Sequence, residues 1–371
     1  MAEQLLLRGG DNYKALERYF QANRAARLFL VCGASIRSLA LDKFFQTLPQ
    51  HCGIQVIRFN DFHPNPSYDS VRKGLRLFQE ERCDIIAAVG GGSAIDVAKC
   101  IRLWAAMDPE QDCLTQAYTP NDVSFLAVPT TAGSGSEATH FAVIYRDGEK
   151  LSVSHPNCIP NAALLDPAVL TSLPEYTRKC TMLDALCHAL ESFWSRNAGD
   201  ESKAFSRAAL QLLLENVDAY LQNKAAGNAA MQRAAYLAGQ AIDRAQTTAG
   251  HAMAYGLTTR YGLAHGQAAA LCVSNLWPYM VEQVALCTLP GGASYLDGVF
   301  QEIAKTMGCA TVQAAIRRYD SLLEGLQLPL PKACEADLSM LCRGVNAQRL
   351  KNNPVPLSPA VIKNLYREIL L

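Results

Sequence analysis

The N-terminal half of the sequence predicts an α/β fold, with a parallel sheet covered by helices on both faces. Short apolar runs rich in β-branched and aromatic residues alternate with helix-like segments. The runs are continuously apolar, and two of them lead directly into loops of glycine and other small residues. Such alternation is typical of parallel sheets, and continuous apolar runs are typical of strands buried on both faces.

The elements follow in order along the chain. A helix is expected over 39–45, after the first strand, and another over 70–81, where Val71, Leu75 and Phe78 share one helical face. In parallel sheets, ligands bind at the carboxyl ends of the strands, so the loops after the strands are the candidate sites. The predicted strands are 27–33, 53–59, 84–90 and 124–129.

Two loops that follow strands predict a phosphate-bearing ligand. Gly90, Gly91, Gly92 and Ser93 lead into a helix, whose free N–H groups and positive dipole end suit a pyrophosphate. This segment is neither a GxGxxG fingerprint nor a Walker A loop, so an ordinary glycine-rich turn is the alternative. The loop 130–137 offers hydroxyl-bearing and small residues. Because two such loops follow parallel strands, we favour a phosphate-bearing ligand over an ordinary glycine-rich turn.

Composition indicates a compact enzyme rather than a nucleic-acid or membrane protein. At 371 residues the chain should form two domains. Lys plus Arg and Asp plus Glu balance at 34 each, so no global field attracts nucleic acid or an anionic membrane. We find no membrane span and no signal peptide. Thirteen cysteines without CxxC pairs indicate reduced thiols, and hence a cytoplasmic protein.

An aspartate and three histidines form a candidate metal site. Asp184 and His188 are four residues apart in a run of helix formers, which places both on one helical face. His251 and His265 follow, and glycines between them predict that one helix ends and another begins near His265. Three imidazoles and a carboxylate suit Zn²⁺ or Fe²⁺. Hydrogen-bonded core histidines are the alternative.

Taken together, the motifs resemble the iron-dependent (group III) alcohol dehydrogenases over nearly the whole chain. The resemblance implies an NAD(P)-binding α/β domain over residues 1–172 and an all-helical metal-binding domain over 173–371. The family is commonly dimeric or larger. The matching segments are 64–67, 90–99, 129–139, 165–167, 183–188 and 353–357, with the two downstream histidines.

The resemblance also implies roles for individual residues. Asp184, His188, His251 and His265 match the ligands of Fe²⁺ or Zn²⁺. Lys150 matches a cofactor position, although a solvated charge in a turn is the alternative. The positions that match NAD or NADP contacts are Asn65, Gly91, Gly92, Ser93, Thr130, Thr131, Ser134 and Lys150.

Two departures from the family pattern affect the expected chemistry. Tyr255 stands where members often have a second histidine of a proton relay, and an unperturbed tyrosine, with a pKa near 10, is a poorer base. Gly33 stands where many NAD-preferring relatives have an aspartate that excludes a 2′-phosphate. NADP(H) should therefore be tolerated, with Arg37 as a partner for the phosphate or simply as a surface charge.

Within the family, segments 146–156, 191–195 and 254–266 look most like the phosphonoacetaldehyde reductases. This similarity implies reduction of phosphonoacetaldehyde to 2-hydroxyethylphosphonate. We expect Arg260, with Thr258 or Thr259, to bind the phosphonate. The alternative is that Arg260 is a charge at a helix C-terminus that interacts favourably with the helix dipole. His140 either faces the substrate or is a plain loop residue. The alternatives are a dehydrogenase for sulfoacetaldehyde, lactaldehyde or butanal, a dehydroquinate synthase-like lyase, and a silent structural protein.

Overall fold

A computed structural model of the chain describes residues 4–371. The chain forms two compact units, one of residues 1–173 with 223–232 and the other of 174–222 with 233–371. The division at residue 172 that the sequence suggested did not anticipate that 223–232 belongs with the first unit. Helix α7 (Ala225–Ala245) therefore has residues in both units.

The first unit is built on a parallel sheet, as predicted. Within the described residues the sheet has six strands in the order β1-β8-β5-β4-β2-β3, and all pairings are parallel. Gly90 pairs with Pro129, so β4 and β5 end side by side at one edge of the sheet. The strands are β1 (Leu5–Arg8), β2 (Arg27–Cys32), β3 (Gln55–Phe59), β4 (Ile85–Gly90), β5 (Ser124–Pro129) and β8 (Ala162–Leu165).

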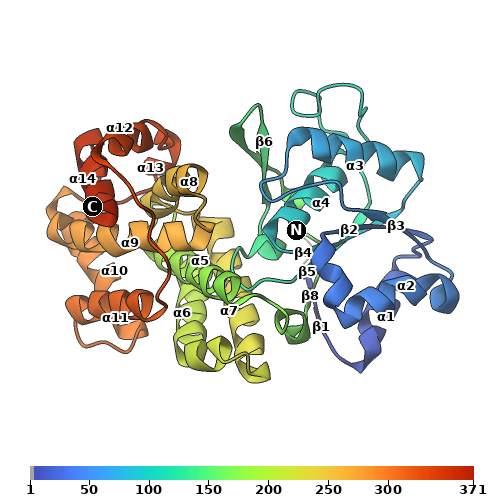
Figure 1. Ribbon diagram of the computed structural model, residues 1–371, viewed down its shortest axis with the longest axis horizontal. Coiled ribbons are helices and arrows are strands. Elements are labelled where there is room, and N and C mark those ends of the chain that lie inside the picture. Colours follow the sequence, from blue (N-terminus) through green and yellow to red (C-terminus); the bar gives the residue numbers. More distant parts are fainter. Residues whose placement is uncertain (1–3) are drawn as a thin grey trace. The chain divides into compact units, whose positions relative to one another are not determined.

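Helices cover both faces of this sheet, because successive strand residues point to opposite sides. In β2, Phe29 and Val31 join one apolar core, whereas Leu28 and Leu30 join the other. Figure 1 shows α3 and α4 on one side of the sheet and α1 and α2 on the other. The helices are α1 (Lys14–Ala22), α2 (Ala40–Cys52), α3 (Tyr68–Glu80) and α4 (Gly92–Trp104).

A β-hairpin that the sequence analysis did not predict follows the second glycine loop. Strands β6 (Phe141–Arg146) and β7 (Glu149–Ser154) pair antiparallel. The two residues between them, Asp147 and Gly148, have positive φ angles of 53° and 80°. Asp-Gly with left-handed backbone is typical of a tight type I′ hairpin turn. Lys150 therefore lies in β7 opposite Tyr145, and not in a turn, where the alternative interpretation placed it.

The second unit is helical, which confirms the expected all-α class. Between residues 174 and 371, whose backbone is described throughout, the regular elements are helices only. Helix α5 packs against α6 and α9, and its many buried side chains make it the central helix of this unit. The helices are α5 (Glu175–Trp194), α6 (Asp200–Leu221), α8 (Ala249–Tyr261), α9 (His265–Glu282), α10 (Gly292–Thr306), α11 (Val312–Gly325), α12 (Glu335–Arg343), α13 (Ala347–Leu350) and α14 (Pro359–Leu370).

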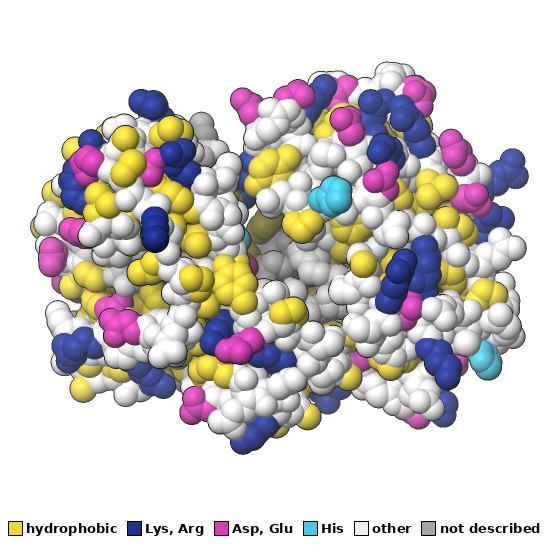
Figure 2. All heavy atoms as spheres, viewed as in Figure 1, with side chains coloured by type: hydrophobic (Ala, Val, Ile, Leu, Met, Phe, Trp, Pro, Cys, Tyr) yellow, Lys and Arg dark blue, Asp and Glu magenta, His cyan; other side chains and the backbone are white. Residues whose placement is uncertain are grey.

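The face shown in Figure 2 has no large patch of one charge sign. Figure 2 shows Lys and Arg side chains interspersed with Asp and Glu over the visible face. All thirteen cysteines are free thiols. Among the described residues, no helix combines the length and apolar character that a membrane crossing requires.

Candidate active site

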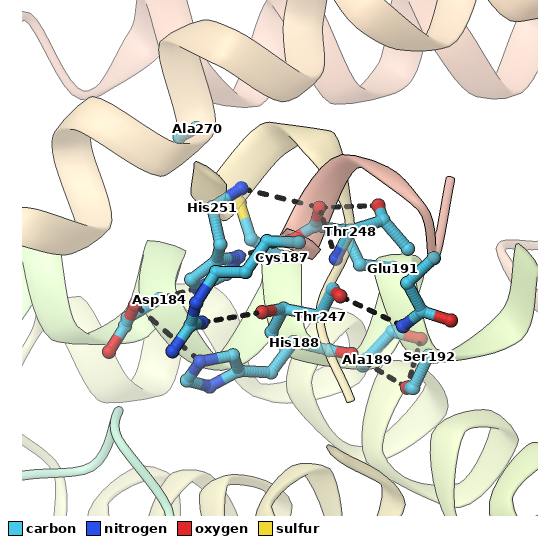
Figure 3. Close-up of polar contacts among 12 residues, drawn as sticks. Asp184, Cys187, His188, Ala189, Glu191, Ser192, Thr247, Thr248, His251 and Ala270 are labelled. Carbon is cyan, nitrogen blue, oxygen red and sulfur yellow. Dashed lines mark hydrogen bonds and ion pairs between the residues drawn. The ribbon is translucent and has the colours of Figure 1, made fainter. Parts of the chain in front are cut away.

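Helix α5 presents the first two residues of the candidate metal cluster. Asp184 and His188 are buried, and Asp184 Oδ1 lies 3.9 Å from His188 Nε2. They come together because residues four apart lie one above the other on a helix. Figure 3 shows both side chains extending from α5. The predicted helical pairing is therefore present.

Helix α8 adds His251 to the same cluster. His251 Nε2 lies 3.5 Å from Asp184 Oδ1, and its ring stacks on His188 with centroids 4.5 Å apart. One ligand atom from each of Asp184, His188 and His251 lies within 4.8 Å of the others. Three metal-type donors from two helices thus converge on one point.

His265 lies beside these three residues, at the start of α9. Helix α8 ends at Gly262, which has a left-handed φ of 67°, and α9 begins at His265 itself. The His265 ring centroid lies 5.3 Å from that of His251 and 5.0 Å from that of Tyr255. The predicted helix break is present, and it places the fourth candidate ligand against the cluster.

Gly266 explains how α9 approaches α5 so closely. A Cβ atom at Gly266 would lie 2.0 Å from the carbonyl oxygen of Cys180 and 2.7 Å from Cβ of Asp184. No side chain fits in that space. The glycine after His265 is therefore needed to bring that histidine next to α5.

A second carboxylate, which sequence reasoning missed, lies behind His251. Glu191 of α5 is fully buried and contacts His251 Nδ1 through Oε2. Its Oε1 accepts hydrogen bonds from the backbone N–H of Thr248 at 3.1 Å and from the Thr248 hydroxyl at 2.6 Å. In Figure 3 the carboxylates of Asp184 and Glu191 lie at either side of His251. A carboxylate on the far nitrogen fixes the tautomer and direction of a metal-ligating histidine.

The buried polar atoms of this cluster fit a bound cation. Asp184 Oδ1 and His251 Nε2 are buried and have no hydrogen-bond partner among the described residues. Buried polar atoms are normally satisfied, and a cation between these two would satisfy both. A set of imidazoles and one carboxylate suits Fe²⁺ or Zn²⁺.

The electrostatics of the cluster also favour a cation. Burial raises the pKa of Asp184, but the neighbouring imidazoles, His188 first among them, outweigh burial and hold that pKa well below its usual range. Burial lowers the pKa of His251, but Glu191 and Asp184 outweigh it and raise that pKa to about 9. Two ionised carboxylates beside one imidazole therefore hold a proton that a divalent cation would replace.

In the first unit, the two predicted loops lie against each other. Thr130 N–H donates to the Gly90 carbonyl at 3.0 Å. A Cβ atom at Gly91 would lie 3.4 Å from Thr131, and one at Gly92 would lie 3.1 Å from Ser134 Oγ. Gly91 is the N-cap of α4 and has no side chain to cap it, so the first N–H groups of α4, with Ser93 in its first turn, suit a pyrophosphate.

Two charged residues of α4 that were not singled out from the sequence support the second loop. Lys99 is fully buried and donates to Thr139 Oγ1 at 2.8 Å and to the Phe141 carbonyl at 2.7 Å. Asp96 accepts from Ser136 Oγ at 2.6 Å and from Val143 N–H at 3.0 Å. The spacing of these residues, three apart on one helix, was the available signal.

The remaining candidates of the first unit lie on several elements. Gly33 follows β2, and Arg37 is exposed in the short 3-10 helix after it. Asn65 is exposed, with a left-handed φ of 59° before α3. His140 immediately precedes β6, and its carbonyl accepts from His155 N–H at 3.0 Å. These roles stay predictions.

Arg260 has a partner that its sequence context did not suggest. It lies in the last turn of α8 and forms an ion pair with Asp337 of α12. The hydroxyl of Tyr261 donates to the other oxygen of Asp337 at 2.8 Å. The charge of Arg260 is thus balanced by a carboxylate, which weakens the case for a phosphonate there.

Comparison with known proteins identifies the family. Residues 5–167 match the iron-containing alcohol dehydrogenase profile, and residues 179–370 match the C-terminal profile of the Fe-containing alcohol dehydrogenase family. The chain belongs to the iron-containing alcohol dehydrogenase family. As a member of this family, it is a metal-dependent NAD(P) oxidoreductase, which confirms the expected enzyme class and cofactors.

Individual relatives agree with this assignment. The chain is 34% identical to phosphonoacetaldehyde reductase from Streptomyces viridochromogenes over 322 residues, covering 82% of this chain and 81% of the relative. It is 33% identical to 1,3-propanediol dehydrogenase from Klebsiella pneumoniae over 256 residues, 66% of this chain and 65% of the relative.

Solved structures show the same fold. The iron-containing alcohol dehydrogenase from Thermococcus thioreducens has a TM-score of 0.87 at 22% identity and covers 100% of this chain and 98% of its own. Sulfoacetaldehyde reductase from Bifidobacterium kashiwanohense, solved with NAD⁺, has a TM-score of 0.84 at 24% identity and covers 99% of this chain and 96% of its own.

Proposed function

We propose that this chain reduces phosphonoacetaldehyde to 2-hydroxyethylphosphonate with NADH or NADPH. The observation that supports this substrate is the 34% identity with phosphonoacetaldehyde reductase over most of both chains. The carbonyl carbon takes a hydride from C4 of the nicotinamide, and the carbonyl oxygen takes a proton. It yields the alcohol and the oxidised cofactor.

The residues of the second unit would hold the metal and the carbonyl end of the substrate. Asp184, His188, His251 and His265 are the proposed ligands, and Glu191 orients His251. When bound, the divalent cation supplies Lewis-acid polarisation of the carbonyl, which favours hydride addition. Because three of the proposed ligands are neutral imidazoles, Asp184 is the only ligand that carries a negative charge. The bound cation would therefore keep charge to stabilise the oxygen on which negative charge develops, with the second carboxylate, Glu191, one imidazole further away.

Tyr255 is the proposed proton donor. Its ring stacks on His265 with an interplanar angle of 15°, which places the phenol next to the proposed ligands. The family often has a second histidine at this position, and a tyrosine there can pass a proton to the product oxygen. Replacement by phenylalanine should slow the chemical step and leave metal binding unchanged.

The first unit would hold the cofactor. Gly91, Gly92 and Ser93 are proposed to bind the pyrophosphate, with Thr130, Thr131 and Ser134 on the facing loop. Asn65 and Lys150 are proposed to contact the rest of the cofactor. Gly33 leaves room for a 2′-phosphate, and the exposed Arg37 supplies a cation for it.

The test is a substrate panel on protein loaded with Fe²⁺ or Zn²⁺. We expect kcat/KM with phosphonoacetaldehyde to exceed that with sulfoacetaldehyde, lactaldehyde, propanal and butanal, with NAD(P)H consumed one for one. A higher value for a neutral aldehyde would reject the proposed substrate. Turnover without net NAD(P)H consumption would instead favour a lyase, and metal-loaded protein without any activity would favour a binding protein.

A further inference from the structure

A second arginine lies closer to the metal cluster than its place in the sequence suggests. Arg349 is in the short helix α13, and its guanidinium carbon lies 5.3 Å from the centre of the Tyr255 ring. Its Nη1 reaches the hydroxyl of Thr247 at 3.5 Å. Within residues 4–371, no carboxylate forms an ion pair with Arg349, so its charge is not balanced locally.

The contacts of Arg349 lead directly to the proposed metal ligands. Tyr255, over which the guanidinium lies, stacks on His265, and the His265 ring lies 5.3 Å from that of His251. Thr247 is the residue before Thr248, which binds Glu191. The arginine thus stands one aromatic ring away from the ligands.

The chain around Arg349 is held in place by Asn352. This buried amide donates to the carbonyls of Ala245 and Thr247 at 3.0 and 2.9 Å. Its Oδ1 accepts from the Ser195 hydroxyl at 3.0 Å. These bonds tie the segment after α13 to the residues just before α8, which contains His251. The backbone beside Arg349 is therefore fixed, and only the arginine side chain would lose freedom on binding a ligand.

We propose that Arg349 binds the anionic group of the substrate whose carbonyl is held at the Asp184, His188 and His251 cluster. The inference rests on the proposed function for the identity of the anion, a phosphonate. In phosphonoacetaldehyde the phosphorus is only three bonds from the carbonyl oxygen, so the anion must bind close to the metal ligands. A planar guanidinium offers paired N–H donors that match phosphonate oxygens. Arg260, by contrast, already pairs with Asp337.

Four variants test this assignment: Arg349→Gln, Arg349→Lys, Arg260→Gln and Lys351→Gln. Each is assayed with phosphonoacetaldehyde and with propanal. We expect Arg349→Gln to lower kcat/KM for phosphonoacetaldehyde about a hundredfold and kcat/KM for propanal less than threefold. Only phosphonoacetaldehyde carries an anionic group that would lose charge-assisted hydrogen bonds to Arg349. Arg349→Lys, which keeps the charge without the fork, should lose about tenfold.

Lys351→Gln is the matched control. Lys351 is exposed and two residues away, so its loss removes the same unit of charge nearby without removing the proposed contact. In Lys351→Gln, the ratio of kcat/KM for phosphonoacetaldehyde to kcat/KM for propanal should stay within about twofold of the ratio in the parent. A similar fall in Lys351→Gln would show long-range electrostatics and overturn a binding role for Arg349. A selective fall in Arg260→Gln instead of Arg349→Gln would overturn it in favour of Arg260.

A binding measurement separates this inference from the proposed function. Ethylphosphonate, which cannot react, is titrated into the parent and into Arg349→Gln by calorimetry. Saturable binding that disappears in the variant supports the inference even if the parent prefers another anionic aldehyde, such as sulfoacetaldehyde. If the parent prefers phosphonoacetaldehyde and Arg349→Gln keeps both that preference and ethylphosphonate binding, the proposed function stands and the role of Arg349 is rejected.

Discussion

Replacing Glu191 by glutamine separates the orientation of His251 from simple burial. The amide has nearly the same shape as the carboxylate but only one acceptor. With its oxygen towards His251, the amide NH₂ would face the N–H and hydroxyl of Thr248, which now donate to Oε1 at 3.1 and 2.6 Å. With its NH₂ towards His251, Nδ1 must become the acceptor. The ring proton then moves to Nε2, the atom that faces Asp184.

Either orientation weakens metal binding. Changes to a carboxylate behind a ligating histidine typically cost 10–100-fold in metal affinity, or about 1.4–2.8 kcal/mol. We expect a loss of about this size for Zn²⁺ in Glu191→Gln. The metal-free variant should also be less stable than the parent, because the change removes one partner of the buried Glu191–His251 pair.

The assay is competition for Zn²⁺ between the metal-free protein and a coloured chelator at fixed pH, with thermal unfolding of the same samples. Glu191→Asp is the companion variant, since it keeps the charge but shortens the reach to Nδ1. A Zn²⁺ affinity for Glu191→Gln within twofold of the parent, measured at a temperature where both metal-free proteins are folded, would refute the orienting role of Glu191.

Three further variants test other parts of the structure. Gly266→Ala should lower the free energy of unfolding by about 1–3 kcal/mol, because the new Cβ would collide with the Cys180 carbonyl. Gly298→Ala is the control and should not lower it, because nothing lies within 4 Å of the new Cβ. Thermal unfolding of both variants is the measurement. Burial raises the pKa of Glu137 to about 7, so the folded state binds the proton more tightly than the unfolded state and stability falls as pH rises from 4.5 to 7. Glu137→Gln should therefore abolish a loss of up to about 3 kcal/mol, measured as unfolding free energies at pH 5 and pH 8. Arg37→Gln should raise KM for NADPH about tenfold and leave KM for NADH unchanged in initial-rate kinetics. An equal rise in both KM values would reject the proposed contact between Arg37 and the 2′-phosphate.

The parallel sheet was accessible from the sequence because its central strands are long, apolar and followed by glycine loops. The short strands β1 (Leu5–Arg8) and β8 (Ala162–Leu165) were not, since four residues show too little pattern to separate strand from loop. The hairpin was missed although Asp147 and Gly148 are a strong turn signal. A local pattern identifies a strand only when the run is long enough to show its period.

Some residues of the candidate site could be predicted from the sequence and others could not. Asp184 and His188 could be paired because helix geometry fixes their distance, and the break before His265 could be predicted from glycines. Glu191 lies three residues beyond His188, but its role depends on Thr248, which is remote in sequence. Arg349 meets Tyr255 only through tertiary packing. Contacts of this kind leave no periodic trace in a single sequence.

The division of the chain into two units has a practical consequence for engineering. The proposed metal ligands, Tyr255 and Arg349 all belong to the second unit, whereas the glycine loops and Arg37 belong to the first. Substitutions in groups that share no partner usually have additive free energies. Coenzyme preference and the preference for charged or neutral aldehydes should then change independently. Substitutions that switch the enzyme from NADPH to NADH could be combined with substitutions that alter aldehyde preference, without re-optimising either set.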